Sequence, residues 1–160
     1  MSATVIAPLA VYIVFGVWGA ILAIVDVRTH RLPNALVLPA YPVGLALLIV
    51  AETTGAQAAG LPTALGAMLT GFAVFFGIAM ISPGALGGGD VKLAGALGLM
   101  LGWLGWNALG VAAVATFLLA GAYAVVAMLA RRAARDTRIA FGPFLVMGSW
   151  VGVAAAWPVI

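Results

Sequence analysis

Cysteine is absent from this chain of 160 residues, and charged residues make up only 7% of it. Without cysteine the chain can form no disulfide, no thiol nucleophile and no cysteine-based metal site. A soluble domain carries roughly 25% charged residues, so this chain has too few to cover the surface of a water-soluble globule. The scarcity of charge therefore predicts an outer surface that faces lipid.

Hydrophobic residues make up 66% of the chain and are grouped in runs long enough to cross a bilayer. We predict spans over approximately residues 3–25, 34–51, 61–81, 90–104, 107–130 and 139–160. Pro39 and Pro42 predict a kink near the start of the second span. The sequence therefore predicts an all-α membrane protein, a polytopic bundle of about six transmembrane helices that forms one domain over residues 1–160.

The fourth predicted span, over residues 90–104, is short for a full crossing and is rich in glycine. Gly95, Gly98 and Gly102 follow one another at helical spacing within it. Small residues at such spacing let two helices approach closely in a membrane. We expect tight packing around this span, and we assign these glycines no function.

The seven basic residues all lie in or beside the first, third and fifth loops between the predicted spans. They are Arg28, Arg31, Lys92, Arg131, Arg132, Arg135 and Arg138. By the positive-inside rule these loops are cytoplasmic, both termini lie outside, and the protein is a multi-pass component of the cytoplasmic (inner) membrane. The basic residues suit contact with membrane lipid. They form no basic stripe with interleaved aromatics, so no nucleic-acid partner is expected.

Two aspartates, Asp26 and Asp90, are predicted to lie at the cytoplasmic face. Asp26 follows the first span and Asp90 opens the fourth, whereas Glu52 lies at the opposite face and is expected to be structural. Each aspartate alone has an ordinary explanation, as an interfacial charge or a helix N-cap. Ionisable residues at membrane depth usually have functions, however. Two close carboxylates would share one proton, so that one activates water and the other donates to a scissile carbonyl.

The residues around the two aspartates suggest supporting roles. Gly87, Gly88 and Gly89 are expected to give the backbone unusual conformations and to leave room for a substrate strand. Lys92 would either support ionised Asp90, meet an acidic substrate residue, or be an ordinary interfacial lysine.

Three further expectations concern the helix ends at these residues. Arg28 is expected to offset the negative helix end at Asp26, and Asn34, after Pro33, to cap the second span. Asp26 and Asp90 lie at opposite helix-dipole ends, which predicts the shared proton on Asp26 and a more acidic Asp90.

Three segments resemble the motifs of the type IV prepilin peptidases, in the family's order and at similar spacing. They are residues 26–34 (DVRTHRLPN), residues 87–93 (GGGDVKL) and residues 139–145 (IAFGPFL). Gly87-x-Gly89-Asp90 also fits the G-x-G-D signature of membrane aspartic proteases. Ala140 replaces the usual proline of the third motif, at a position that is not catalytic.

The resemblance implies a membrane aspartic endopeptidase that cleaves the leader peptides of type IV prepilin or pseudopilin precursors at the cytoplasmic face. Asp26 and Asp90 match the two catalytic aspartates. The implied partners are the precursor and the pilus or type II secretion machinery. No cofactor and no metal is expected, and His30, the single histidine, is expected to be a surface residue. The chain resembles the short, peptidase-only forms, with no N-terminal methyltransferase region.

Three other functions stay open at this point. A broader intramembrane aspartic protease of the G-x-G-D type would use the same acids, although the motifs at Pro33 and Phe141 favour the prepilin branch. A transporter or channel could use Asp26 and Asp90 as an ion or proton site, but transporters usually bind near the membrane midplane. A catalytically silent scaffold for pilus assembly would not need both acids.

Overall fold

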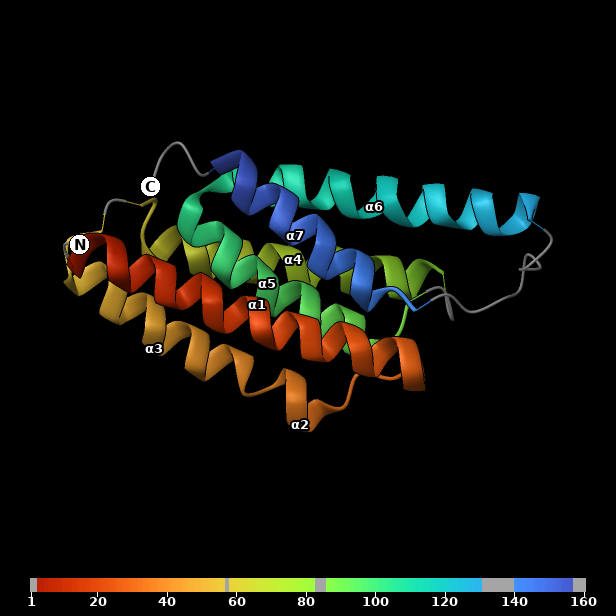
Figure 1. The fold of residues 1–160 in the computed structure, drawn as a ribbon, viewed down its shortest axis with the longest axis horizontal. Coiled ribbons are helices and arrows are strands. Elements are labelled where there is room, and N and C mark those ends of the chain that lie inside the picture. Colours follow the sequence, from red (N-terminus) through yellow and green to blue (C-terminus); the bar gives the residue numbers. More distant parts are fainter. Residues whose placement is uncertain (1–2, 57, 83–85, 131–139, 157–160) are drawn as a thin grey trace.

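The computed structural model describes residues 3–56, 58–82, 86–130 and 140–156, and it confirms the all-α prediction (Figure 1). The helices are α1 (Ala3–Thr29), α2 (Asn34–Val37), α3 (Ala40–Thr53), α4 (Leu61–Ile81), α5 (Gly88–Leu104), α6 (Trp106–Leu129) and α7 (Gly142–Ala156). Four segments are long and apolar enough to cross a membrane: Pro8–Thr29, Asn34–Thr53, Leu61–Ile81 and Trp106–Leu129. The chain is therefore a multi-pass membrane protein.

The helix ends near the first loop differ from the predicted ones. Helix α1 continues through Asp26 to Thr29, so this aspartate belongs to the last turn of the helix. The expected kink is a break, because α2 ends at Val37 and α3 begins at Ala40, on either side of Pro39. Proline lacks the N–H that a continuous helix requires. Asn34 is not the N-cap: Pro33 occupies that position, and Asn34 is the first residue of α2.

Helix α5 is the centre of the bundle and contacts α2, α3, α4, α6 and α7. All of its residues from Asp90 to Trp103 except Lys92 are buried. Figure 1 shows α1 beside α3, α4 beside α5, and α6 beside α7, as three successive pairs of helices. A helix that is apolar all round is normally enclosed by protein, which explains how the short fourth predicted span forms the core.

The glycines of α5 make the close contacts that the sequence predicted. A Cβ atom at Gly98 would lie 2.6 Å from the backbone oxygen of Ala67 on α4. One at Gly95 would lie 2.5 Å from the Tyr41 hydroxyl on α3, and one at Gly102 would overlap Ala67. These positions have no room for a side chain, so the two neighbouring helices approach α5 directly.

The two ends of the bundle carry different polar groups. The C-terminal end of α1 and the N-terminal ends of α5 and α7 lie together, at the end of the molecule opposite the start of α1 and the end of α7 (Figure 1). Asp26 and Asp90 belong to the first group of helix ends. Glu52 lies at the opposite end, where its Oε2 accepts a 3.1 Å hydrogen bond from the N–H of Leu61, the first residue of α4. The structural role expected for Glu52 is confirmed.

Candidate active site

Asp26 lies in the last turn of α1 and is only 5% exposed. Its Oδ2 accepts a buried 2.8 Å hydrogen bond from the backbone N–H of Gly142, the first residue of α7. A Cβ atom at Gly142 would lie 2.7 Å from the same Oδ2. The first turn of α7 therefore positions the Asp26 carboxyl through a backbone N–H.

Asp90 lies in the first turn of α5, at the third helical position, and is 9% exposed. Its Oδ2 accepts a 3.0 Å hydrogen bond from the N–H of Gly87, the residue that caps the helix. Its Oδ1 is buried and has no hydrogen-bond partner within the described part of the chain. An unpartnered buried oxygen is costly when the carboxyl is ionised, and it is available to hold a proton.

The electrostatics of Asp90 connect the two carboxyls. Asp90 lies at the helix start, outside the four segments long enough to cross a membrane. Burial raises the pKa of Asp90 to about 6, the Gly87 N–H opposes this, and the negative charge of Asp26 raises it further. The shift in the pKa of Asp90 is opposite to the direction that the helix dipole alone predicted, because burial outweighs the dipole. Burial and the charge of Asp26 thus both favour the protonated form of Asp90.

The glycines before Asp90 differ from one another in their surroundings. None of the three has a positive φ; Gly87 is extended, and Gly88 and Gly89 are already helical, so the expected unusual conformations are wrong. A Cβ at Gly89 would lie 2.5 Å from the Cβ of Leu32 in the first loop. At Gly88 a Cβ would meet nothing within 4 Å. Gly89 thus permits a close contact with Leu32, and there is open space beside Gly88.

The remaining predicted site residues are not in contact with the two carboxyls in the ways expected. Lys92 donates a 2.7 Å hydrogen bond from Nζ to Asn34 Oδ1. Residues two apart on a helix do not face each other, so the Lys92 side chain does not support Asp90 directly. For the same reason Arg28, which is exposed, does not face the buried Asp26. Pro33 is the N-cap residue of α2. Arg131, Arg132, Arg135 and Arg138 lie outside the described residues.

The sequence predicts no role for Gly142, although its backbone N–H bonds to Asp26. It belongs to the third motif, residues 139–145, which was recognised without a role for any of its members. The order of the motif, Phe141-Gly142-Pro143 before an apolar run, is the available signal, because proline and glycine commonly mark a helix start. The motif places a backbone N–H of α7 on Asp26.

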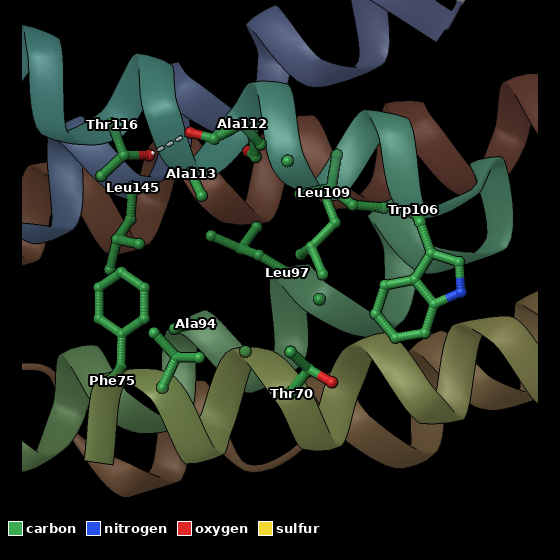
Figure 2. Close-up of a pocket in the computed structure, with 16 residues that line it drawn as sticks. Thr70, Phe75, Ala94, Leu97, Trp106, Leu109, Ala112, Ala113, Thr116 and Leu145 are labelled. Atoms are coloured by element: carbon green, nitrogen blue, oxygen red, sulfur yellow. Dashed lines mark hydrogen bonds between the residues drawn. The ribbon is translucent and has the colours of Figure 1, made fainter. Parts of the chain in front are cut away.

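A separate cavity of about 240 Å³ lies between α4, α5, α6 and α7 (Figure 2). Its three hydroxyl side chains each donate to a carbonyl of their own helix: Thr70 to Gly66, Thr116 to Ala112 and Ser149 to Val146. Neither aspartate lines the cavity, and its remaining lining residues are apolar or glycine. It therefore offers a hydrocarbon-like surface.

An aromatic group joins one end of this cavity to the region of Asp26. Phe75 lines the cavity, at the end opposite Trp106 (Figure 2). Its ring centroid lies 5.7 Å from that of Phe117 and 6.1 Å from that of Phe141. Phe141 directly precedes Gly142, so packing at this end of the cavity fixes the start of α7 and with it the N–H that binds Asp26.

Comparison with known proteins places these features in a family. Residues 13–129 match the model of the type IV leader peptidase family. Prepilin leader peptidase/N-methyltransferase of Escherichia coli (strain K12) is 33% identical over 144 residues, which cover 85% of this chain and 59% of the relative. The protein of the same name from Dickeya chrysanthemi is 31% identical over 149 residues, covering 92% and 51% respectively. This chain spans about half the length of the relatives it matches. No solved structure matches it.

Proposed function

Because this chain belongs to the type IV leader peptidase family, we propose that it is a membrane aspartic endopeptidase that cleaves the leader peptide of prepilin-like or pseudopilin precursors. The observation that carries the proposal is the arrangement of Asp26 and Asp90. The two aspartates are 64 residues apart in sequence and lie on α1 and α5. Both are buried, and the charge of Asp26 acts on Asp90. The proposal concerns peptide hydrolysis alone, with the precursor as the protein partner and the pilus or type II secretion machinery as the destination of the product.

The two carboxyls have different environments, which suits them to different roles. Asp26, held by the Gly142 N–H, acts as the general base and takes a proton from a water molecule. The water oxygen attacks the scissile carbonyl carbon while protonated Asp90 donates its proton to the carbonyl oxygen. The C–N bond of the tetrahedral intermediate then breaks as the proton on Asp26 passes to the leaving amine. Asp90 takes a proton back from one hydroxyl of the intermediate, whose oxygen becomes the carbonyl oxygen of the new carboxyl group. No covalent enzyme intermediate forms.

The position of the acids also supports cleavage at the cytoplasmic face. Arg28, Arg31 and Lys92 lie at the same end of the bundle as Asp26 and Asp90, whereas Glu52 lies at the other. Basic residues are concentrated on the cytoplasmic side of membrane proteins. The dyad would therefore meet the part of a precursor that remains in the cytoplasm, with both ends of the chain on the outer side of the membrane.

Co-expression with candidate prepilin and pseudopilin precursors tests the proposal, with the shortened product detected by gel shift and its new N-terminus sequenced. We expect cleavage by the natural chain and loss of product, to below about one thousandth of its rate, in both Asp26→Asn and Asp90→Asn. Glu52→Gln is the matched control, since it changes an acid at the opposite end and should leave cleavage intact. Cleavage that persists in both aspartate variants would refute the dyad.

A further inference from the structure

Three contacts fasten the segment after Asp26 to the first turns of α5. Leu32 packs on Gly89, and a Cβ atom added at Gly89 would lie 2.5 Å from the Cβ of Leu32. Asn34 Oδ1 accepts the 2.7 Å hydrogen bond from Lys92 Nζ. The Tyr41 hydroxyl donates a 2.6 Å hydrogen bond to the backbone oxygen of Lys92. The contacts lie in order along both partners, so residues 32–41 follow α5 as a strap.

The strap links the surroundings of the two acids, because it continues covalently from α1 and contacts α5 without a covalent bond. It begins in the loop that follows the end of α1 at Thr29, and its first contact is with Gly89, the residue immediately before Asp90. The N–H of His30 still bonds to the carbonyl of Asp26 at 2.8 Å, so the loop starts from a fixed helix end. A change in how the strap sits on α5 would therefore change the position of one carboxyl relative to the other.

Lys92 is placed to control the seating of this strap. It is the one residue between Asp90 and Trp103 that is not buried, and its ammonium group is directed to Asn34, 58 residues away in sequence. Its backbone oxygen holds Tyr41, whose hydroxyl lies against Gly95. The side chain and the backbone of Lys92 thus each form a hydrogen bond with the strap. A charge-assisted bond of this kind is stronger than a bond between neutral groups.

We propose that Lys92, acting through Asn34, is a positioning residue that seats the 32–41 strap on α5 and thereby sets the geometry of Asp26 and Asp90. The expected effect on cleavage rests on the proposed function. The seating of the strap by Lys92 rests on the contacts alone. It differs from a role for Lys92 in binding the substrate, because the ammonium group is already bonded within the chain.

The kinetic test compares four variants with the natural chain, using purified protein and a precursor that it cleaves. Lys92→Met keeps the aliphatic stem and removes the charge, and we expect kcat to fall about tenfold with KM nearly unchanged. Asn34→Leu should have the same effect. Asn34→Asp keeps an acceptor oxygen and should retain activity close to that of the natural chain. Lys92→Met combined with Asn34→Leu should lose no more than either alone, since both remove one bond.

Two kinetic results would overturn the proposal. A rise in KM with unchanged kcat in Lys92→Met would show that the ammonium group contacts the substrate. Full activity in Asn34→Leu, with loss in Lys92→Met, would show that Lys92 acts without Asn34. The melting temperatures of all variants are also measured in detergent, so that a loss of activity can be separated from a loss of folding. Asn34→Asp serves as the reference variant at the same position.

A second readout requires no activity and uses the absence of cysteine from the chain. Leu32→Cys introduces the sole thiol at the contact with Gly89, and its rate of modification by maleimide reports how firmly the strap is seated. We expect slow labelling in the otherwise natural chain and at least fivefold faster labelling when Lys92→Met is added. Equal rates would refute the positioning role. If the natural chain cleaved no precursor, the proposed function would fail while this measurement still decided the role of Lys92.

Discussion

The backbone N–H of Gly142 donates a 2.8 Å hydrogen bond to Oδ2 of Asp26, across 116 residues of sequence. The bond connects the first turn of α7 to the last turn of α1. Each carboxyl thus accepts one backbone N–H bond, Asp26 from a distant helix and Asp90 from Gly87 at the start of its own helix, but Oδ1 of Asp90 is buried without a partner among the described residues. This difference between two otherwise similar acids supports their assignment as base and acid.

Substitution of Gly142 should impair catalysis through Asp26. In Gly142→Ala the new methyl group would lie 2.7 Å from Asp26 Oδ2, so the carboxylate or the start of α7 must shift. We expect kcat for precursor cleavage to fall about 10–100-fold, as small displacements of catalytic groups can do. Gly110→Ala is the matched control, because a Cβ there meets nothing within 4 Å. Equal activity of the two variants would contradict a positioning role for Gly142.

The pH dependence of cleavage should report the protonation of Asp90. Its pKa is raised to about 6, first by burial, and the proposed mechanism requires its protonated form. We therefore expect kcat/KM to fall as the pH rises through and above about 6, measured with a precursor fragment in detergent at constant ionic strength. A rate that rises steadily between pH 5 and 8 would assign the acid role to another group.

The same pKa shift predicts how stability depends on pH. A carboxyl whose pKa is higher in the folded than in the unfolded protein, here about 6 against 3.8, stabilises the fold fully at low pH. That contribution is lost as the pH rises through about 6. Asp90→Asn has no such proton to lose, so the melting temperature of the natural chain should fall more steeply between about pH 4 and 6 than that of the variant. Parallel curves would indicate that Asp90 is not perturbed.

Two adjacent glycines should respond differently to the same substitution. Gly89→Ala would push against Leu32, with its Cβ 2.5 Å from that of the leucine, and we expect lower melting temperature and lower activity. Gly88→Ala meets nothing within 4 Å and gains helix propensity, so its melting temperature should be equal or higher. Loss of activity in a fully stable Gly88→Ala variant would indicate that substrate occupies the open space.

The proposed orientation can be tested with single thiols in the cysteine-free chain. Ala35→Cys lies in α2 at the end that holds the two acids, and Thr53→Cys lies at the end of α3; both positions are exposed. We expect a membrane-impermeant maleimide to label Thr53→Cys in intact cells and Ala35→Cys only after the membrane is opened. The reverse pattern would place the acids outside and refute cleavage at the cytoplasmic face.

Much of this architecture could be predicted from local sequence because membrane insertion depends on local composition. The scarcity of charge predicted a membrane bundle and Gly98 predicted a close helix contact, and both are confirmed. Pro39 and Pro42 predicted a kink near the start of the second span, where the structure has a break between α2 and α3. These features depend on what a residue type can do in lipid or in a helix, whatever its distant neighbours are.

The relationships that build the site could not be predicted in the same way. Gly142 contributes a backbone N–H, a group that nearly every residue carries, so only the fold shows which one meets Asp26. Lys92 was expected near Asp90 from its position in sequence, yet helix geometry directs its side chain to Asn34. The direction of the Asp90 pKa shift depends on burial, which the dipole argument did not include.

The bond between Gly142 and Asp26 also has a consequence for biosynthesis. Helix α7 follows every other described helix, so the ribosome produces its first turn after both aspartates have been synthesised. A nascent chain that ends before residue 140 carries Asp26 and Asp90 but lacks the N–H that holds Asp26. The proposed dyad therefore gains this hydrogen bond only after residue 142 has been translated.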